Sequence, residues 1–500
     1  MDRLTEMFKY TTLGPAQFWA LSPVIALSFL AVVTLIISAT GGKGHNLSRW
    51  CSLLGVLVIL IFQMRGIHAP EITILDDILI FNAFTRVLSL IVMGIGFFSL
   101  LLVTGQSKRE KLLPEIYPLV LFSMAGMVLL AQTNHLMLMF IAIEIMSLAV
   151  YVLVGMQRTA SYAVEASLKY FILGGAASAM FAYGAALVYG ATGTFGLRAI
   201  SLLLTSDSVT GLTLLSVGGL LILAGLFFKV GAFPFHFWIP DVYQGATHSI
   251  TGFMSAAVKF AAFIPLIKIA QQLFFVLPGK YGLLFYVIIW LFAAITMLYA
   301  NLAALVQNEL KRLLAYSSIA HTGYLLAGVL ICAMAPQGAA PLIVYLIFYI
   351  FSALGAMGIV ILLAEPFQRD VSFTDIAGIA ENRPYLAFAL SVFMLAMAGI
   401  PMTAGFIGKY ILLSNVVNQG GTHLVVIAVL SSLISVYYYL RVVVLMYMGP
   451  AGQVAEKAIE RPKTGMLIGP IAVASVMLVM TVQFGLFPKA VIAYIYRILH

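Results

Sequence analysis

Long apolar stretches follow one another along almost the whole chain and are separated by short polar segments. About 20 helical residues are needed to cross the roughly 30 Å hydrocarbon core of a bilayer. Continuous runs of this kind differ from the alternating segments of about 10 residues found in transmembrane β-barrels. The pattern therefore predicts an all-α polytopic membrane protein with about fourteen transmembrane helices. The fourteen stretches are residues about 17–40, 47–64, 78–104, 117–133, 135–155, 166–190, 211–233, 249–270, 282–305, 313–334, 341–364, 385–416, 423–448 and 466–487.

The composition agrees with this class, because 62% of the 500 residues are hydrophobic and only 9% are charged. In soluble domains about a quarter of the residues are charged. The longest polar stretches, about residues 190–210, 365–384 and 449–465, are too short to fold alone. Residues 1–500 are thus predicted to form a single integral membrane domain. The N-terminal sequence MDRLTEMFKYTTLGP lacks the features of a signal peptide or a transit peptide.

The sequence carries no motif for a redox cofactor, a nucleotide or a metal ion. Its two cysteines, Cys51 and Cys332, cannot supply the four thiolates of an iron–sulfur cluster. It has no GxGxxG motif opening a helix after a strand and no GxxxxGK[ST] motif, and its histidines and acids lack the short spacing of a metal site. The net charge of +9 comes from scattered basic residues rather than a nucleic-acid-binding patch. No bound cofactor, metal or nucleic acid is therefore expected.

The distribution of the 27 Lys and Arg residues predicts the orientation. With the N-terminus on the non-cytoplasmic side, the odd-numbered loops and adjoining span ends carry 15 of them, and the termini and even-numbered loops carry 8. Short cytoplasmic loops are enriched in Lys and Arg, so both termini are predicted on the non-cytoplasmic side. The other four lie inside spans and are Arg86, Lys229, Lys259 and Lys409.

Glu144 is the one acidic residue of the 18 that lies inside a predicted span, in FIAIEIMSLAVYVLVG. A charge at the centre of a membrane helix costs about 2.5 to 3.5 kcal/mol on insertion scales, so such a group is a functional candidate by default. A structural ion pair or a permanently protonated carboxyl is the alternative interpretation of Glu144.

Two of the buried lysines lie beside predicted helix breaks. Lys229 precedes Pro234 by five residues in KVGAFPFHFWIPDVYQG, and Lys409 follows Pro401 by eight residues in MAGIPMTAGFIGKYILL. Proline lacks an N–H group and clashes with the preceding turn, so both helices should be interrupted in the membrane. Exposed backbone at this depth is tolerated where it lines a protein cavity or water. Simple packing is the alternative, because Pro and Gly are common in membrane helices.

The order of lysine and proline is reversed between the two segments, as an inverted-topology repeat would produce. Lys259, in SITGFMSAAVKFAAFIPLI, is the third buried lysine. Desolvation lowers the pKa of a lysine to as low as about 5 to 6, and a nearby carboxylate raises it again. The set Glu144, Lys229, Lys259 and Lys409 is therefore a candidate proton relay across the middle of the bilayer.

His321, in LLAYSSIAHTGYLLAG, could bridge the lysines, because histidine has the unperturbed pKa closest to 7. A hydrogen-bonded structural histidine is an equally good interpretation. Arg86 is expected to have a structural role, either anchoring its helix or pairing with Asp76 or Asp77.

Four polar residues near predicted span ends have two interpretations each. Glu165 and Lys169 have the i, i+4 spacing of a helix ion pair, and a role in proton uptake is the weaker alternative. His236 and Asp241 follow the first predicted helix break. They either form the mouth of a proton path or cap the loop.

The segment from Lys229 to Lys259, KVGAFPFHFWIPDVYQGATHSITGFMSAAVK, resembles the signature of the antiporter-like subunits of respiratory complex I and of Mrp cation/proton antiporters. Four further segments point to the branch formed by subunit N of NADH-quinone oxidoreductase: FIAIEIMSLAVYVLVG, EASLKYFILGGAASAMFAYG, ELKRLLAYSSIAHTGYLL and MAGIPMTAGFIGKYILL. The resemblance extends over essentially the whole chain.

The resemblance implies fourteen helices with two inverted five-helix repeats, residues 117–270 and 282–448, and discontinuous helices at spans 7 and 12. It implies that Glu144 and Lys229 are the paired acid and base of one half-channel. Lys259 would be the connecting lysine, and Lys409 would belong to the second half-channel.

The resemblance also implies partners and a location. NADH, FMN, iron–sulfur clusters and quinone would be bound by other subunits. The chain would contact a neighbouring antiporter-like subunit, small membrane subunits and lipid, and would carry protons. The lack of a targeting segment agrees with a bacterial plasma (inner) membrane.

One short segment departs from the family pattern. The family usually has GAPT or a similar sequence after DVYQG, whereas this chain has GATHS, with Thr247 in place of the expected proline and His248 directly after it. The shape of this loop is therefore not implied by the resemblance, and His248 adds a titratable group.

Two other function classes stay open at this point. The same lysines would exchange H⁺ for Na⁺ in a subunit of a Mrp-type Na⁺/H⁺ antiporter complex, although the helix around His321 is closer to subunit N. In a membrane scaffold, the lysines would only pair with acidic groups.

Overall fold

The computed structural model describes residues 14–40, 44–75, 77–105, 113–206, 211–332, 338–364, 370–450 and 467–498. The predictions for residues 1–13, for Asp76 and for most of the segment 449–465 lie outside the described residues. In the described part of the chain, helices are by far the dominant element. They are α2 (Pro15–Ser38), α3 (Gly44–Met64), α4 (Ala83–Val103), α5 (Ile116–Gln132), α6 (Leu136–Val154), α7 (Ser161–Thr192), α8 (Leu197–Thr205), α9 (Leu212–Val230), α10 (Trp238–Gly245), α11 (His248–Phe253), η1 (Met254–Val258), α12 (Lys259–Ile269), η2 (Ala270–Phe274), α13 (Lys280–Leu305), α14 (Leu310–Cys332), α15 (Ala339–Ala364), α16 (Pro384–Ala398), α17 (Ala404–Asn418), α18 (Thr422–Met448), α20 (Ile468–Leu486) and α21 (Lys489–Ile498).

Twelve helical spans among the described residues are long and apolar enough to cross a membrane. The chain is thus a mostly helical multi-pass membrane protein. Two further apolar helices, α5 and α16, have 17 and 15 residues. Each coincides with a predicted span or with half of one, but the total of fourteen transmembrane helices stays a prediction.

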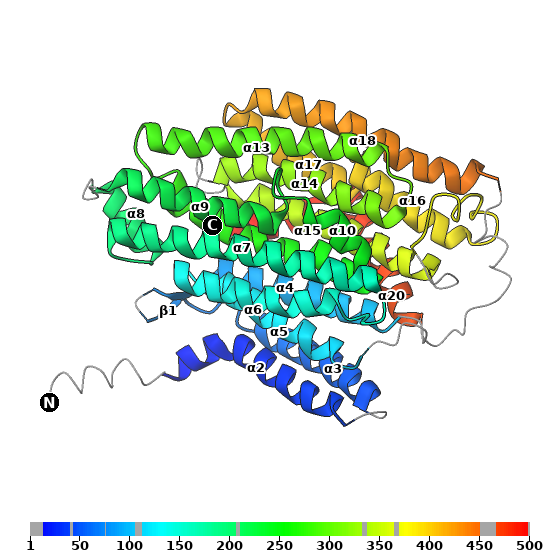
Figure 1. Ribbon diagram of the computed structural model, residues 1–500, viewed down its shortest axis with the longest axis horizontal. Helices are drawn as coiled ribbons and strands as arrows, with labels where there is room; N and C mark the ends of the chain where they lie inside the picture. The colour runs from blue at the N-terminus through cyan, green and yellow to red at the C-terminus, as the bar shows by residue number, and fades with distance from the viewer. Residues whose placement is uncertain are drawn as a thin grey trace.

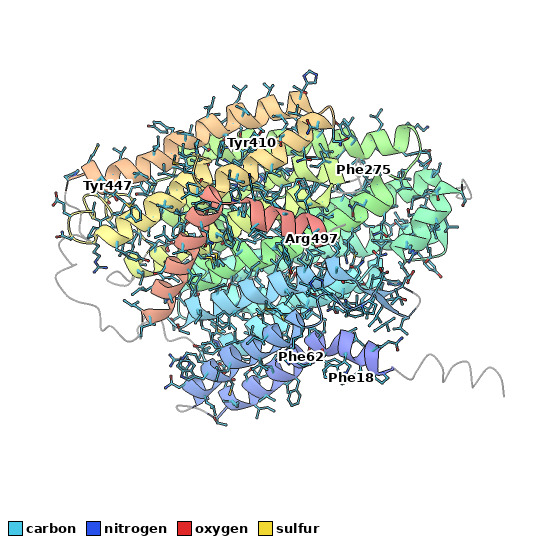
Figure 2. The ribbon with its side chains drawn as sticks, turned by 180° about the vertical axis from the view of Figure 1, so that it is seen from behind. Phe18, Phe62, Phe275, Tyr410, Tyr447 and Arg497 are labelled. Carbon is cyan, nitrogen blue, oxygen red and sulfur yellow. The ribbon has the colours of Figure 1, made fainter. Side chains whose placement is uncertain are left out.

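The helices form one elongated bundle in which most axes run in a similar direction (Figure 1). Helices α2 and α3 form one edge of the bundle, and α13 and α18 lie along the opposite edge. The last helix, α21, contacts α15 and α4, and Figure 2 shows its Arg497 over the middle of the rear face. Exposed apolar side chains cover the outer helices, for example Phe29 of α2, which is 70% exposed, as expected for a surface that faces lipid or other subunits.

A small β-hairpin departs from the all-helical prediction. Strands β1 (Ile72–Ile74) and β2 (Leu79–Phe81) pair in antiparallel register, with Ile72 opposite Phe81. The third span was expected to begin near residue 78, but α4 begins at Ala83, where the Asn82 side chain accepts a hydrogen bond from the Thr85 N–H. This N-cap marks the start of α4. The apolar residues of β2 before it lengthen the apolar run, so the run alone does not show where the helix begins.

Arg86 has the expected structural role but a different partner. Its guanidinium donates to the main-chain carbonyls of Ala69 and Pro70, so it fastens the segment before the hairpin to α4. Of the alternatives for Arg86, pairing with Asp77 is not observed, because Asp77 forms an ion pair with Arg198 at the start of α8, at 3.1 Å.

Both predicted helix breaks are present. Helix α9 ends at Val230 and is followed by Gly231 at φ 74°, a short linker, and then α10. Helix α16 ends at Ala398 and is followed by Gly399 at φ 86°, and α17 begins at Ala404. Glycine adopts this left-handed conformation without the steric cost that a side chain brings.

A single helical rod, formed by α11, η1, α12 and η2, runs through the middle of the bundle. Every residue of this rod from His248 to Ala270 is buried within the protein. The segments Met254–Val258 and Ala270–Phe274 form π-helical turns, which widen the helix by one residue per turn and recur at functional sites. Lys259 directly follows the first of them.

Helices α7 and α9 approach each other closely through glycines. A Cβ atom on Gly184 would lie 2.5 Å from the carbonyl oxygen of Gly218, and one on Gly225 would lie 2.7 Å from the carbonyl oxygen of Ala177. Small residues at such a contact let membrane helices pack backbone to backbone. This contact holds the helix that carries Lys229 against the rest of the first half of the bundle.

We predict that Gly184→Val destabilises the protein by about 1–3 kcal/mol, because the added side chain forces α7 and α9 apart. Gly175→Val on the same helix is the matched control, because a Cβ on Gly175 would meet nothing within 4 Å. Thermal unfolding in detergent, monitored by a thiol-reactive dye or by aggregation, measures the difference. Equal melting temperatures for the two variants would show that the close approach is not required.

Candidate functional site

Glu144 lies on α6 at the border between the protein interior and the outer apolar surface. Its carboxylate accepts a hydrogen bond from the Ser178 hydroxyl of α7. The side chain is half-buried, and its neighbour Ile145 is 38% exposed. No ion pair joins Glu144 to Lys229 among the ion pairs of the described residues. Glu144 and Lys229, the acid and base that the resemblance implies, are therefore not in direct ionic contact.

Lys229 is buried, with 7% of its surface exposed, and contacts the same face of α6 that carries Glu144. Its ammonium donates to the Ser147 hydroxyl at 2.8 Å and to the Tyr151 hydroxyl at 3.1 Å. Ser147 is three residues after Glu144, one helical turn further along. Gly174 of α7 makes room for the Tyr151 ring, because a Cβ there would lie 2.0 Å from the hydroxyl.

The carbonyl groups at the end of α9 are bonded by side chains from other segments. The indole N–H of Trp238 donates to the Phe228 carbonyl at 3.0 Å, and the Thr322 hydroxyl of α14 donates to the Val230 carbonyl at 2.8 Å. The last carbonyls of a helix have no partner within the helix. These two bonds therefore fix the break next to Lys229 and attach it to α14.

Lys259 contacts α14 directly. Its ammonium donates to both the main-chain carbonyl and the hydroxyl of Ser318, the hydroxyl at 2.9 Å. The same ammonium lies 4.7 Å from the centre of the Tyr349 ring of α15, within the range of a cation–π interaction. Thr322 also donates to the Ser318 carbonyl, at 3.3 Å. Ser318 and Thr322 thereby link Lys259 to the broken end of α9.

His321 lies one helical turn beyond Ser318 and is 3% exposed. Its Nδ1 atom is 2.5 Å from the Tyr345 hydroxyl, and its Nε2 atom is 3.4 Å from the Tyr439 hydroxyl. Tyr439 in turn is hydrogen-bonded to Ser317. The imidazole therefore has a hydroxyl partner on each nitrogen, which suits both a proton relay and a structural histidine.

Lys409 contacts the broken end of α16. Its ammonium donates to the carbonyls of Met397 at 3.0 Å and Ala398 at 3.1 Å, and to the Ser432 hydroxyl of α18 at 3.2 Å. It also lies 4.9 Å from the centre of the Tyr324 ring of α14. The lysine thus supplies the donors that the last carbonyls of α16 lack.

One helix, α14, brings these groups together. Within two turns of α14, Ser318 contacts Lys259, and Thr322 bonds the end of α9 beside Lys229. Tyr324 contacts Lys409, and His321 lies between these residues in the sequence. The partners of the three lysines are hydroxyls, carbonyls and rings. Among the described residues, none of the three lysines forms an ion pair with a carboxylate.

Sequence reasoning missed two further buried lysines, which it assigned to loops. Lys268 is 5% exposed and donates to the carbonyls of Ala131 and Thr133, at the end of α5, at 2.7 and 2.8 Å. Lys311 is 2% exposed and donates to the Ala246 carbonyl and to Asp370. Lysines near span ends ordinarily extend to the membrane surface, so only the packing of other segments shows that these are enclosed.

The remaining candidates lie toward one end of the bundle. The predicted helix ion pair of Glu165 and Lys169 is confirmed at 2.8 Å, and Lys169 also pairs with Asp241 at 3.1 Å. Asp241 pairs further with Arg312 at 3.3 Å. His236 is buried among aromatic rings. In the described part of the chain, no group of three His, Cys, Asp or Glu side chains is placed to hold a metal ion.

Fold and site together define a polytopic helical membrane protein in which buried lysines lie at interrupted helices. The sequence pattern of the NADH:quinone oxidoreductase/Mrp antiporter transmembrane family matches residues 133–435. NADH-quinone oxidoreductase subunit N of Trichlorobacter lovleyi is 37% identical over 433 residues, which cover 86% of this chain and 87% of that protein.

Two solved structures extend the comparison. A chain of respiratory complex I from Thermus thermophilus is 32% identical, with a TM-score of 0.76, and the match covers 94% of this chain and 98% of that one. A chain of the Mrp complex from Dietzia sp. has a TM-score of 0.80 at 18% identity, over 96% of this chain and 97% of that one, and shows a common fold alone. The chain belongs to the NADH:quinone oxidoreductase/Mrp antiporter family, in its NADH-quinone oxidoreductase subunit N branch.

We predict that Thr322→Val lowers the free energy of unfolding by about 1–3 kcal/mol, because the Val230 carbonyl loses its donor inside the protein. Thr481→Val is the control, because the Thr481 hydroxyl only bonds the Met477 carbonyl of its own helix, at 2.7 Å. Hydrogen exchange of the amides in α9 and α10, followed by mass spectrometry, should show faster local opening in the first variant only.

Proposed function

We propose that the chain is a membrane-arm subunit of a proton-pumping NADH-quinone oxidoreductase and carries protons through its buried Lys and Glu residues. Electron transfer from NADH to quinone in other subunits would supply the energy. The observation that carries the proposal is the bonding of Lys229, Lys259 and Lys409 to neutral groups inside an apolar bundle. A desolvated lysine that is not bonded to a carboxylate exchanges a proton readily.

Each candidate residue has a distinct role in this scheme. Glu144 and Lys229 form the acid and base of the first half-channel, Lys259 is the connecting lysine, and Lys409 serves the second half-channel. His321, with a tyrosine hydroxyl at each nitrogen, passes protons between Lys259 and Lys409. Glu144 acts on Lys229 by charge: a carboxylate that approaches the lysine favours its protonated form, and one that withdraws favours release.

The energy must come from outside the chain. Moving one charge against a membrane potential of 100 mV costs about 2.3 kcal/mol. NADH, FMN, the iron–sulfur clusters and the quinone would belong to partner subunits. A neighbouring antiporter-like subunit and small membrane subunits would cover part of the exposed apolar surface that also contacts lipid.

We also propose the finer architecture of fourteen helices and two inverted five-helix repeats, residues 117–270 and 282–448. Each proposed repeat has its interrupted helix in fourth place, with a buried lysine in it. In each, that lysine faces a tyrosine ring of the second helix: Lys229 lies 5.5 Å from the Tyr151 ring centre, and Lys409 lies 4.9 Å from that of Tyr324. The orientation would place both termini on the non-cytoplasmic side of a bacterial plasma (inner) membrane.

The alternative, a subunit of a Mrp-type Na⁺/H⁺ antiporter complex, rests on the common fold. Purification separates the two functions. A tagged chain extracted gently from native membranes should come down with flavin and iron–sulfur signals and with NADH:quinone activity. If it comes down only with other membrane subunits and without redox centres, Na⁺-dependent proton exchange becomes the activity to assay.

We predict that Lys229→Met abolishes most NADH-driven proton pumping by the purified complex in liposomes, because methionine keeps the length of the side chain but cannot hold a proton. Lys280→Met, at the exposed start of α13, is the control and should pump at the normal rate. Fluorescence quenching of a pH-sensitive dye measures the pumping. Normal pumping by Lys229→Met and Lys409→Met would favour the scaffold role instead.

A further inference from the structure

A second cluster of buried charged groups lies at the end of the bundle where α10, α11 and α14 meet. The carboxylate of Asp370 accepts a hydrogen bond from Lys311 at 3.0 Å, and the same oxygen lies 3.5 Å from Nε2 of His248. Lys311 also donates to the Ala246 carbonyl at 2.8 Å. The proposed relay of Glu144 and the three lysines uses none of these side chains.

His248 is the member of this cluster with an unfilled hydrogen-bonding position. It is 9% exposed, and its buried Nε2 atom has no hydrogen-bond partner. Asp370 and Lys311 are the charged groups among the described residues that face it. From the other helices packed against α11, Leu102 of α4 and Met357 of α15 present apolar side chains beside Gly252. The imidazole therefore lies near a carboxylate without a hydrogen bond at its Nε2 atom.

Polar residues that follow His248 along the central helix lead toward Lys259. Thr251 comes three residues after His248, on the same helix face. Ser255 lies within the π-helical turn Met254–Val258, and Lys259 directly follows this turn. Thr251 and Ser255 line a cavity together with Tyr243, Tyr349 and apolar side chains of α14, α15 and α16. Seven residues of rise place Ser255 about 10 Å further into the bundle than His248.

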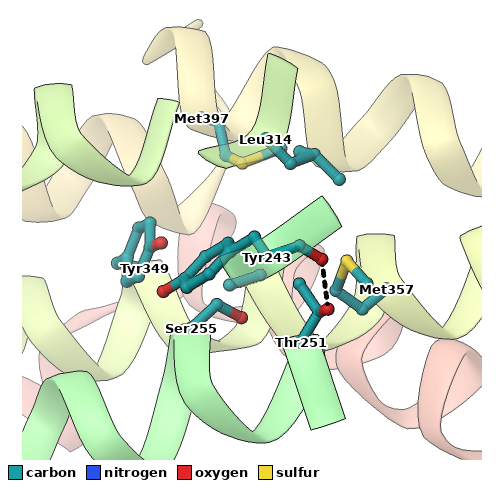
Figure 3. Close-up of a pocket in the computed structure, with 8 residues that line it drawn as sticks. Tyr243, Thr251, Ser255, Leu314, Tyr349, Met357 and Met397 are labelled. Atoms are coloured by element: carbon teal, nitrogen blue, oxygen red, sulfur yellow. Dashed lines mark hydrogen bonds between the residues drawn. The ribbon is translucent and has the colours of Figure 1, made fainter. Parts of the chain in front are cut away.

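One residue that lines the cavity, Tyr349, also contacts Lys259, whose ammonium lies 4.7 Å from the centre of its ring. Figure 3 shows the Tyr243 hydroxyl pointing toward Ser255 and Tyr349, while Thr251 donates to the Tyr243 carbonyl. Both tyrosine hydroxyls interact with the side chain of Ser318, which accepts from Lys259. The space suffices for roughly one water molecule, and the surrounding hydroxyls offer the two or more partners that a buried water needs.

We propose that His248, which lies beside Asp370 and Lys311, is the proton-uptake group of a path that runs through the cavity beside Tyr243 to Lys259. This inference rests on the proposed function. A hydronium ion on the Asp370 side gives a proton to Nε2 of His248, which forms an N–H bond, and leaves as water. The imidazolium releases a proton through the hydroxyls of Thr251 and Ser255 to the neutral amine of Lys259, and the imidazole returns to its neutral form. On the orientation that the basic residues predict, uptake is from the cytoplasm.

The test compares His248→Gln, Lys259→Met and the double variant in the whole complex, reconstituted in liposomes. We expect His248→Gln to lose pumping rate, most strongly at alkaline pH where protons are scarce. We also expect the double variant to pump no more slowly than Lys259→Met, because the two residues act in one path. His423→Gln, an exposed histidine at the start of α18, should leave the rate and its pH profile unchanged.

The outcomes separate the two proposals. If Lys259→Met is impaired but His248→Gln has the normal rate and pH profile, the uptake path is wrong and the proposed function stands. If Lys259→Met and Lys229→Met both pump normally, the proposed function itself is wrong, and the path fails with it. Additive losses in the double variant would place His248 outside the path to Lys259 and overturn the inference.

A measurement on the unmodified protein covers the case in which His248→Gln does not assemble. Exchange of the imidazole C2 hydrogen in heavy water, read by mass spectrometry of the peptide that contains His248, reports protonation and contact with water. We expect a sigmoidal dependence of the exchange rate on pH in the intact complex. Absence of exchange over the whole pH range in which the complex pumps would overturn the proposal.

Discussion

The hydrogen bonding of main-chain carbonyl groups at helix ends inside the bundle is the constraint on which the site depends. Where a helix ends within a membrane, no bulk water is available, and a buried carbonyl without a donor is costly. At the end of α9 the donors come from Trp238 and Thr322, at the end of α16 from Lys409, and at the end of α5 from Lys268. Two buried lysines, Lys409 and Lys268, thus donate to carbonyl groups that helix ends place in the interior.

The bonding of the relay lysines determines what they can do. A lysine paired with a carboxylate would be held in its charged form, and removing either partner would leave a buried charge. Lys229, Lys259 and Lys409 instead have hydroxyls and carbonyls as partners. A hydroxyl can accept from the ammonium or donate to the neutral amine, so Ser147 and Ser318 remain bonded in both protonation states. This arrangement lowers the free-energy cost of adding a proton to the lysine or removing one from it.

The membrane class, the two helix breaks and the buried lysines beside them were predictable from the sequence, because each has a local signal: a long apolar run, or Pro and Gly next to a lone lysine. The burial of Lys268 and Lys311 was not, since their partners come from segments more than fifty residues away. The hairpin before α4 was not predicted, because its second strand is apolar and continues into the apolar run of the helix. The indirect connection of Glu144 to Lys229, through Ser147 and Tyr151 of α6, was not predictable either, because it depends on how the helices pack.

The position of α14 has a consequence for how this protein can vary. One stretch of eight residues, from Ser317 to Tyr324, supplies contacts to Lys259, to the broken end beside Lys229, and to Lys409. A shift or rotation of this helix would alter all three surroundings at once. The two halves of the bundle therefore cannot be tuned independently through α14, and changes specific to one half must arise on helices that serve that half alone, such as α6 for Lys229 and α18 for Lys409.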